Sequence, residues 1–107
     1  MELNYYQTRS FGTAVYPNRT DKEAVEYTLF GMLGEAGEIA NKYKKILRKG
    51  LALGPQEKAM LMDEAGDVLW YLAAFVRELG YSLEEVGQFN LDKLSARKVM
   101  GELKDHA

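Results

Sequence analysis

Two short strings that are almost the same hold the acidic residues most able to do chemistry. "GEAGE" contains Glu35 and Glu38, and "DEAGD" contains Glu64 and Asp67. Residues three apart lie on the same face of a helix, so each pair points two carboxylates in one direction. All-oxygen ligands suit Mg²⁺ or Mn²⁺, whereas zinc sites generally use His or Cys. If the two pairs converge, they predict a site for a divalent cation.

Two long helices are expected to position these acids. A capping box of Thr20 with Glu23 predicts a helix that begins just after it, and Gly50 is its natural stop. Pro55 suits the first turn of a second helix, which Gly80 ends. Because the connecting loop is short, the two helices should pack antiparallel, with both acidic pairs at a similar level.

The rest of the chain adds two predicted helices and no strand. A weaker pattern predicts a short helix within residues 1–13, with a break at Pro17. A second capping box, Ser82 with Glu85, begins a last helix that extends to about Val99. The predicted fold class is therefore all-α, a four-helix bundle.

Glycines interrupt both acidic strings, although each costs about 0.8 to 1 kcal/mol relative to alanine inside a helix. They are Gly34, Gly37 and Gly66. We expect these small residues either to let helices come close or to leave space for a bulky ligand beside the metal.

Residues outside the acidic pairs are candidates for binding a substrate. Asn90, Lys93 and Arg97 fall on one face of the last helix and can contact phosphates, although a solvated C-terminal helix shows the same pattern. Lys42 follows Glu38 by four residues, so it can form an ordinary surface ion pair or help neutralise a polyphosphate. Tyr71 lies on the acidic side of its helix and is a candidate for stacking on a base.

Composition limits the class of protein. The 107 residues, 47% of them hydrophobic, fit a single domain spanning residues 1–107. The absence of cysteine excludes thiolate metal sites and agrees with a reducing cytoplasm. A net charge of −2 gives no sign of nucleic-acid binding. The sequence starts without a signal-peptide layout and contains no membrane span, so we expect a cytoplasmic protein.

Three segments, "LGEAGEIANKYKK", "DEAGDVLWYLAAF" and "NLDKLSARK", resemble the MazG-like nucleoside triphosphate pyrophosphohydrolases, over about Leu29 to Arg97. That family has ExxE, a spacer and then ExxD, and all four acidic positions are filled here. The resemblance implies an all-α homodimer or homotetramer with the four acids as Mg²⁺ ligands. It also implies hydrolysis of nucleoside triphosphates, often deoxynucleotides, between the α and β phosphates, giving monophosphate and pyrophosphate.

The resemblance also suggests individual roles. Asn90 and Lys93 match family positions near the substrate phosphates, and Arg97 matches less closely. Metal ions would orient water for in-line attack at the α phosphorus, and one of the four carboxylates would take its proton. Glu38 is our first choice for that base, although the sequence does not decide among the four. Lys93 and Arg97 would stabilise the leaving pyrophosphate.

Other interpretations stay open. A sensor of the same fold would bind a metal–nucleotide complex without turnover, and a non-catalytic helical oligomer would leave the acids merely exposed. A di-iron bundle needs Glu-x-x-His pairs, whereas the single histidine, His106, lies in a tail that we expect to fray. The long helices carry apolar residues on more than one face, so a symmetric dimer should cover the excess and complete the nucleotide pocket.

Overall fold

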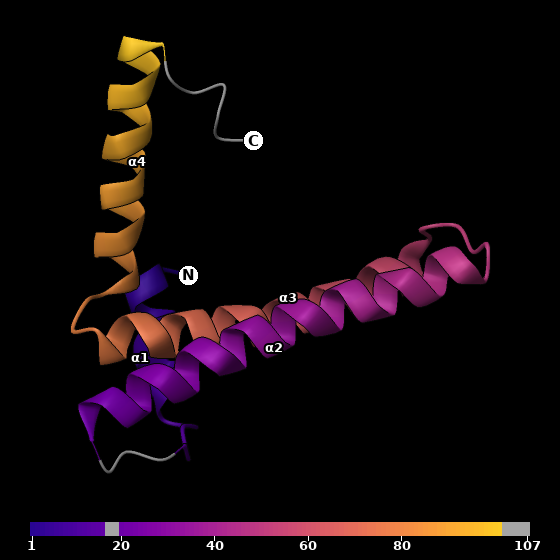
Figure 1. Ribbon diagram of the computed structural model, residues 1–107, viewed down its shortest axis with the longest axis horizontal. Helices are drawn as coiled ribbons and strands as arrows, with labels where there is room; N and C mark the ends of the chain where they lie inside the picture. Colours follow the sequence, from indigo (N-terminus) through magenta and orange to yellow (C-terminus); the bar gives the residue numbers. More distant parts are fainter. Residues whose placement is uncertain (17–19, 102–107) are drawn as a thin grey trace.

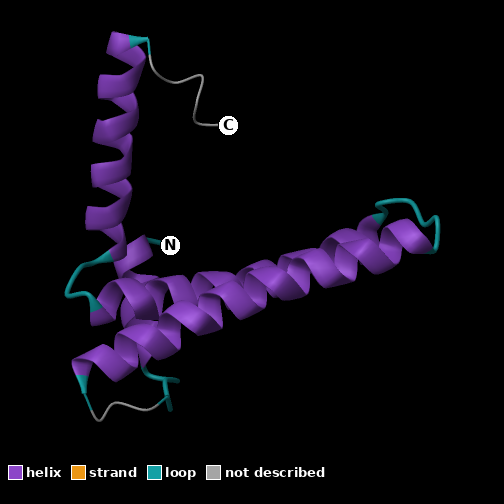
Figure 2. Cartoon of the chain, viewed as in Figure 1, coloured by secondary structure: helices purple, strands orange, loops and turns teal. Residues whose placement is uncertain are grey.

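The computed structural model describes residues 1–16 and 20–101, which contain four helices and no strand (Figures 1 and 2). The helices are α1 (Leu3–Phe11), α2 (Asp21–Arg48), α3 (Pro55–Glu78) and α4 (Leu83–Met100). The predicted all-α class with four helices is confirmed. The predicted break at Pro17 and the predicted fraying of the tail lie outside the described residues.

Local signals explain where the helices begin and end. The hydroxyl of Thr20 accepts a hydrogen bond from the Glu23 N–H at 3.0 Å, which caps α2. Ser82 and Glu85 form the predicted reciprocal capping box of α4, with bonds of 3.1 and 3.0 Å. After α2 the chain turns at Gly50, whose φ of 65° is a conformation that favours glycine. These predicted boundaries are confirmed.

The helices α2 and α3 lie side by side and antiparallel over most of their length (Figure 1). Along α2, the less exposed residues recur every three or four positions, which keeps one face of the helix against its neighbour. One such series is Ala24, Thr28, Gly31, Glu35, Ile39, Lys42 and Ile46. The line of contact between the two helices, here called the seam, therefore includes an acidic and a basic side chain among its small and apolar ones.

Two polar side chains of α1 hold the start of α4. The buried amide of Gln7 donates to backbone carbonyls of α3 and of the α3–α4 turn, at 3.2 and 3.1 Å, and accepts from the Leu83 N–H at 3.1 Å. Asn4 accepts from the Glu84 N–H at 3.0 Å. The first N–H groups of a helix have no partner within it, and the bond from Leu83 satisfies one that would otherwise be buried unpaired. These hydrogen bonds also fix where α4 begins relative to α3.

Beyond its start, α4 extends away from the paired helices and makes no contact with α2 (Figure 1). The radius of gyration is 16.7 Å, whereas a compact chain of this length has about 13 Å. The predicted four helices are present, but they do not close into a bundle within one chain. Leu83 at the start of α4 packs against α3, whereas apolar side chains further along α4, such as Phe89, remain exposed.

We predict that Gln7→Ala destabilises the protein by about 1 to 3 kcal/mol, because it leaves the buried Leu83 N–H without its partner and removes the bonds to the Ala73 and Tyr81 carbonyls. Urea denaturation at a fixed protein concentration measures this change. The matched control is Gln88→Ala, which removes an exposed amide bonded only to Asp92 and should change stability by less than about 0.5 kcal/mol. Equal effects of the two substitutions would contradict the bridging role of Gln7.

Candidate metal centre

Three acidic side chains meet beside the seam and are here called the acidic cluster. Glu35 of α2 and Glu64 and Asp67 of α3 each offer a carboxylate oxygen, and these three atoms lie within 4.8 Å of one another. Glu64 is buried, Glu35 is half-buried and Asp67 is exposed. The antiparallel pairing of α2 with α3 therefore brings together three of the four acids that the sequence singled out.

Glu38 is not part of this group. It follows Glu35 by one helical turn, but its side chain is exposed, and the next residue, Ile39, takes the half-buried position at the seam. A glutamate side chain has three rotatable bonds, so this position does not prevent it from turning toward a cation. Its role as a ligand or as a base stays a prediction.

The cluster is electrostatically unfavourable in the absence of a cation. The pKa of Glu35 is raised above its ordinary value, first by burial and then by the neighbouring carboxylates of Asp67, Glu64 and Glu38. A raised carboxyl pKa means that the charged form is disfavoured in the folded state. The stability linked to this group is present below the ordinary carboxyl pKa and is lost as pH rises through the raised pKa. A bound cation would reverse that penalty.

Lys42 supplies a positive charge to the cluster. Its ammonium group donates a hydrogen bond to the Glu64 carboxylate across the seam, instead of forming the same-helix pair with Glu38 that the sequence suggested. The side chain of Glu64 is 9% exposed and that of Lys42 is 32% exposed. This hydrogen bond is the main cause that raises the pKa of Lys42. The ammonium group of Lys42 thus pairs with the buried member of the acidic cluster.

The donor set fits a hard divalent cation. All three groups of the cluster are carboxylates, one of them is buried, and the protein's own ammonium group already sits against that one. Mg²⁺ is commonly held by a few carboxylates and completes its coordination with water and substrate phosphates. Glu35, Glu64 and Asp67 are therefore the residues that would hold such an ion.

The ring of Tyr71 lies close to the cluster, within the helix contact. It covers Gly31 of α2, where a Cβ atom would overlap it. Trp70 meets it edge to face, with ring centroids 5.0 Å apart. The pKa of the Tyr71 hydroxyl is raised chiefly by burial, then by Tyr27, and then by carboxylates of the cluster. Its predicted stacking on a base stays a prediction.

The glycines beside the acids are not needed for close approach of the helices, which was one of the two roles we expected. A Cβ atom at Gly34, Gly37 or Gly66 would meet no other atom within 4 Å, so close approach of α2 and α3 does not require these glycines. Gly31 has that role instead. It lies four residues before Glu35 on the same helix face, so the spacing that identifies the acids also points to it. Space for a ligand remains the other predicted role of the three glycines.

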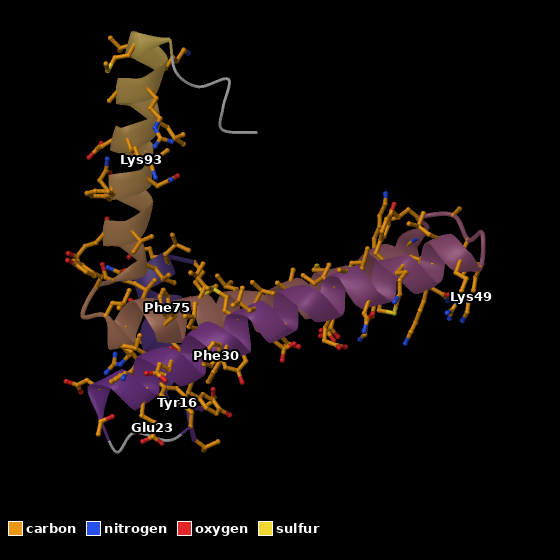
Figure 3. All side chains as sticks on the ribbon, viewed as in Figure 1. Tyr16, Glu23, Phe30, Lys49, Phe75 and Lys93 are labelled. Carbon is orange, nitrogen blue, oxygen red and sulfur yellow. The ribbon has the colours of Figure 1, made fainter. Side chains whose placement is uncertain are left out.

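The predicted phosphate-binding residues lie apart from the cluster within one chain. Asn90, Lys93 and Arg97 belong to α4, which makes no contact with α2. Figure 3 shows Lys93 on the part of α4 that stands away from the paired helices. Asn90 and Lys93 line an open groove of about 680 Å³ together with other residues of α4 and its preceding turn. Their contact with a substrate phosphate stays a prediction.

These features define a class: an all-α protein in which two antiparallel helices bring together carboxylates that could hold a divalent cation. The chain belongs to the family of the MazG nucleotide pyrophosphohydrolase domain, whose sequence model matches residues 23–100. The matched range includes every member of the acidic cluster. The resemblance seen in the sequence is thereby confirmed.

Comparison with known proteins found a related sequence but no similar solved structure. "Gene 37 protein" of Mycobacterium phage L5 is 43% identical over 105 residues, which cover 94% of this chain and 92% of that protein. A comparison with solved structures gave no match. Among the residues that the structure describes, no helix is long and apolar enough to cross a membrane.

Opposite effects of two alanine substitutions would test the roles of the glycines. Gly31→Ala should destabilise the protein by about 1 to 3 kcal/mol, because its methyl group displaces the Tyr71 ring from the helix contact. Gly34→Ala has free space around its Cβ and should stabilise α2 by about 0.8 to 1 kcal/mol. Thermal denaturation of both variants measures the difference, and a similar loss at both positions would contradict the assignment.

Proposed function

We propose that this protein hydrolyses nucleoside triphosphates, with deoxynucleotides as the preferred class, between the α and β phosphates in a Mg²⁺-dependent reaction. Mn²⁺ is the expected substitute for Mg²⁺. The observation that carries the proposal is the meeting of Glu35, Glu64 and Asp67 in a chain of the MazG family. Neighbouring carboxylates that repel one another, one of them buried, are a costly arrangement unless a cation binds to them.

The residues of the cluster have distinct parts in this reaction. A divalent cation held there would neutralise phosphate charge and make a coordinated water more acidic. Glu35, Glu64 and Asp67 are the proposed ligands, and Glu38 would be the fourth when its side chain turns inward. Glu38 is also the proposed base, because it is exposed beside the cluster and outside its closest contacts.

The bond changes follow from attack by water at the α phosphorus. A new bond forms between the water oxygen and that phosphorus, while the bond to the oxygen that bridges the α and β phosphates breaks. A carboxylate takes the proton of the attacking water, and pyrophosphate leaves with the electron pair of the broken bond. Asn90, Lys93 and Arg97 are the proposed phosphate-binding groups, together with Lys42, and Tyr71 is the proposed contact to the base.

A homodimer or homotetramer is part of the proposal. The chain exposes 8018 Å², whereas a compact monomer of this mass exposes about 6,000 Å². The excess is about 2,000 Å² for each chain, or about 4,000 Å² for two, which is within the range of about 2,000 to 5,000 Å² that obligate interfaces bury in total. Large apolar side chains such as Phe30, Leu33 and Phe89 contribute to this surface. A neighbouring subunit would bring its α4, with Asn90 and Lys93, toward the acidic cluster.

Sedimentation should therefore show a dimer or tetramer. We predict that Phe89→Asp shifts the protein toward monomers, because Phe89 is 74% exposed in the single chain and a buried unpaired charge strongly disfavours association. Ser95→Asp places the same charge at a polar, exposed position of α4 and should leave the assembly unchanged. A wild-type protein that sediments as a monomer at micromolar concentration would contradict the assembly.

A panel of nucleoside and deoxynucleoside triphosphates, assayed for monophosphate and pyrophosphate with and without Mg²⁺, tests the proposed activity. We predict release of both products only with the metal. Asp67→Asn should lower kcat by about a hundredfold or more, because loss of a ligand removes several kcal/mol of charge stabilisation.

The control for Asp67→Asn is Asp63→Asn. Asp63 is also exposed and lies one turn earlier on α3, but it is not in the acidic cluster. This variant should keep most of the activity. Metal binding without release of pyrophosphate from any nucleotide would mean that the protein is a sensor and not a hydrolase.

A further inference from the structure

The geometry points to Lys42 as a resident counter-ion that occupies the acidic cluster until a metal ion displaces it. This inference rests on the proposed function, because it concerns the same site. Lys42 is then a positioning residue with two partners in turn: the Glu64 carboxylate in the metal-free protein and the substrate phosphates when metal and nucleotide are bound. The metal and the nucleotide should consequently bind cooperatively.

The first observation is the contact across the seam. The Lys42 ammonium donates to Glu64 Oε1, and Glu64 is the buried member of the cluster. An oxygen of the same residue lies within 4.8 Å of carboxylate oxygens of Glu35 and Asp67. A single ammonium group therefore offsets the negative charge at the place where a divalent cation would bind.

The second observation concerns the distances that a metal ion imposes. Mg²⁺ binds carboxylate oxygens at about 2.0 to 2.1 Å. An ammonium group that stays hydrogen-bonded to the same carboxylate would then lie only a few ångströms from a doubly charged ion, and like charges repel strongly at that separation. The metal and the Lys42 ammonium consequently compete for Glu64.

The third observation is that the Lys42 side chain has open space beside it, into which it can move when a metal ion binds. The side chain is 32% exposed, and it lines an open pocket of about 220 Å³ together with Lys45 and Lys49. Lys42 follows Glu35 by seven residues, so it shares the helix face of the cluster. A released ammonium group stays beside the cation and can bind the oxygens of a phosphate held there.

These observations predict a coupling between two ligands. The metal alone must displace Lys42 from the buried Glu64 to water or to an exposed carboxylate such as Glu38, where an ion pair contributes little, so the metal alone binds weakly. A metal with a triphosphate provides a new partner for Lys42, so each of the two should strengthen the binding of the other by the same factor. The protein would thus avoid holding a metal tightly when no substrate is present.

Binding of Mn²⁺ alone tests the inference, with free Mn²⁺ followed by electron paramagnetic resonance in the absence of nucleotide. We expect Lys42→Met to bind Mn²⁺ about fivefold or more tightly than the wild type, because the competing charge is gone. Lys42→Arg keeps the charge and should bind about as weakly as the wild type. Lys44→Met loses the same charge at an exposed position of α2 and should change the affinity less than about twofold.

A second measurement uses the wild-type protein and does not depend on how a variant folds. The ¹⁵N signal of the Lys42 ammonium group, assigned by its absence in Lys42→Arg, should show hydrogen-bond protection without metal. Saturating Mg²⁺ should shift it toward the signal of a solvated lysine. An unchanged signal at saturation would overturn the inference.

The outcomes separate this inference from the proposed function. Release of pyrophosphate by the wild type, together with a Lys42→Met variant that binds Mn²⁺ no more tightly, overturns the role of Lys42 and leaves the hydrolase. Tighter Mn²⁺ binding by Lys42→Met in a protein that hydrolyses no nucleotide supports the role of Lys42 and removes the hydrolase. A protein that binds no divalent cation removes both.

Discussion

Repulsion among three carboxylates beside one helix contact is the constraint on which the rest of this structure depends. Acidic side chains so close together would move apart in a flexible chain, so rigid helices must hold them in place. Helices α2 and α3, of 28 and 24 residues, extend well beyond the cluster in both directions. A packed group of Ala73, Val76 and Leu83 anchors the C-terminal end of α3. Packing at that end thus compensates for the unfavourable electrostatics in the middle.

Placing charged side chains at the helix contact also explains why the single chain has a small apolar core and a large exposed apolar surface. The seam gives space to Glu35, Glu64 and Lys42 where a stable helix pair would bury leucine or phenylalanine. Among residues 1–16 and 20–101, the largest fully buried side chain is that of Thr28, so the apolar core is small. Small cores generally gain stability from association. The exposed apolar side chains of α2 and α4 are the surface that the proposed assembly would cover.

Spacing along the helices predicted much of this structure, because helix ends and shared faces depend on neighbours in the sequence. The capping residues, the antiparallel pairing and the meeting of Glu35 with Glu64 and Asp67 all follow from positions three or four apart and one short loop. The hydrogen-bond partner of Lys42 could not be predicted from this spacing. Glu38 on the same helix and Glu64 on the next are both plausible partners, and only the register of α2 against α3 decides between them.

The other differences have the same origin in contacts between helices. Whether the α2 contact face passes through Glu38 or Ile39 depends on how the two helices cross. Whether Gly31 or Gly34 allows a close approach depends on where the Tyr71 ring lies. The direction of α4 depends on Gln7, which lies more than seventy residues before the turn that it holds. No local pattern contains that information.

Hydrogen bonds between α1 and α4 allow α1, which lies far from the acidic cluster, to influence the proposed reaction. Helix α1 lies outside the range that matches the family model, yet Gln7 and Asn4 fix the first residues of α4. In the proposed assembly, Asn90 and Lys93 reach a phosphate only if α4 leaves its own subunit in the correct direction. The hydrogen bonds of α1 would then determine the distance between the phosphate-binding groups of one subunit and the carboxylates of another, without contacting substrate or metal.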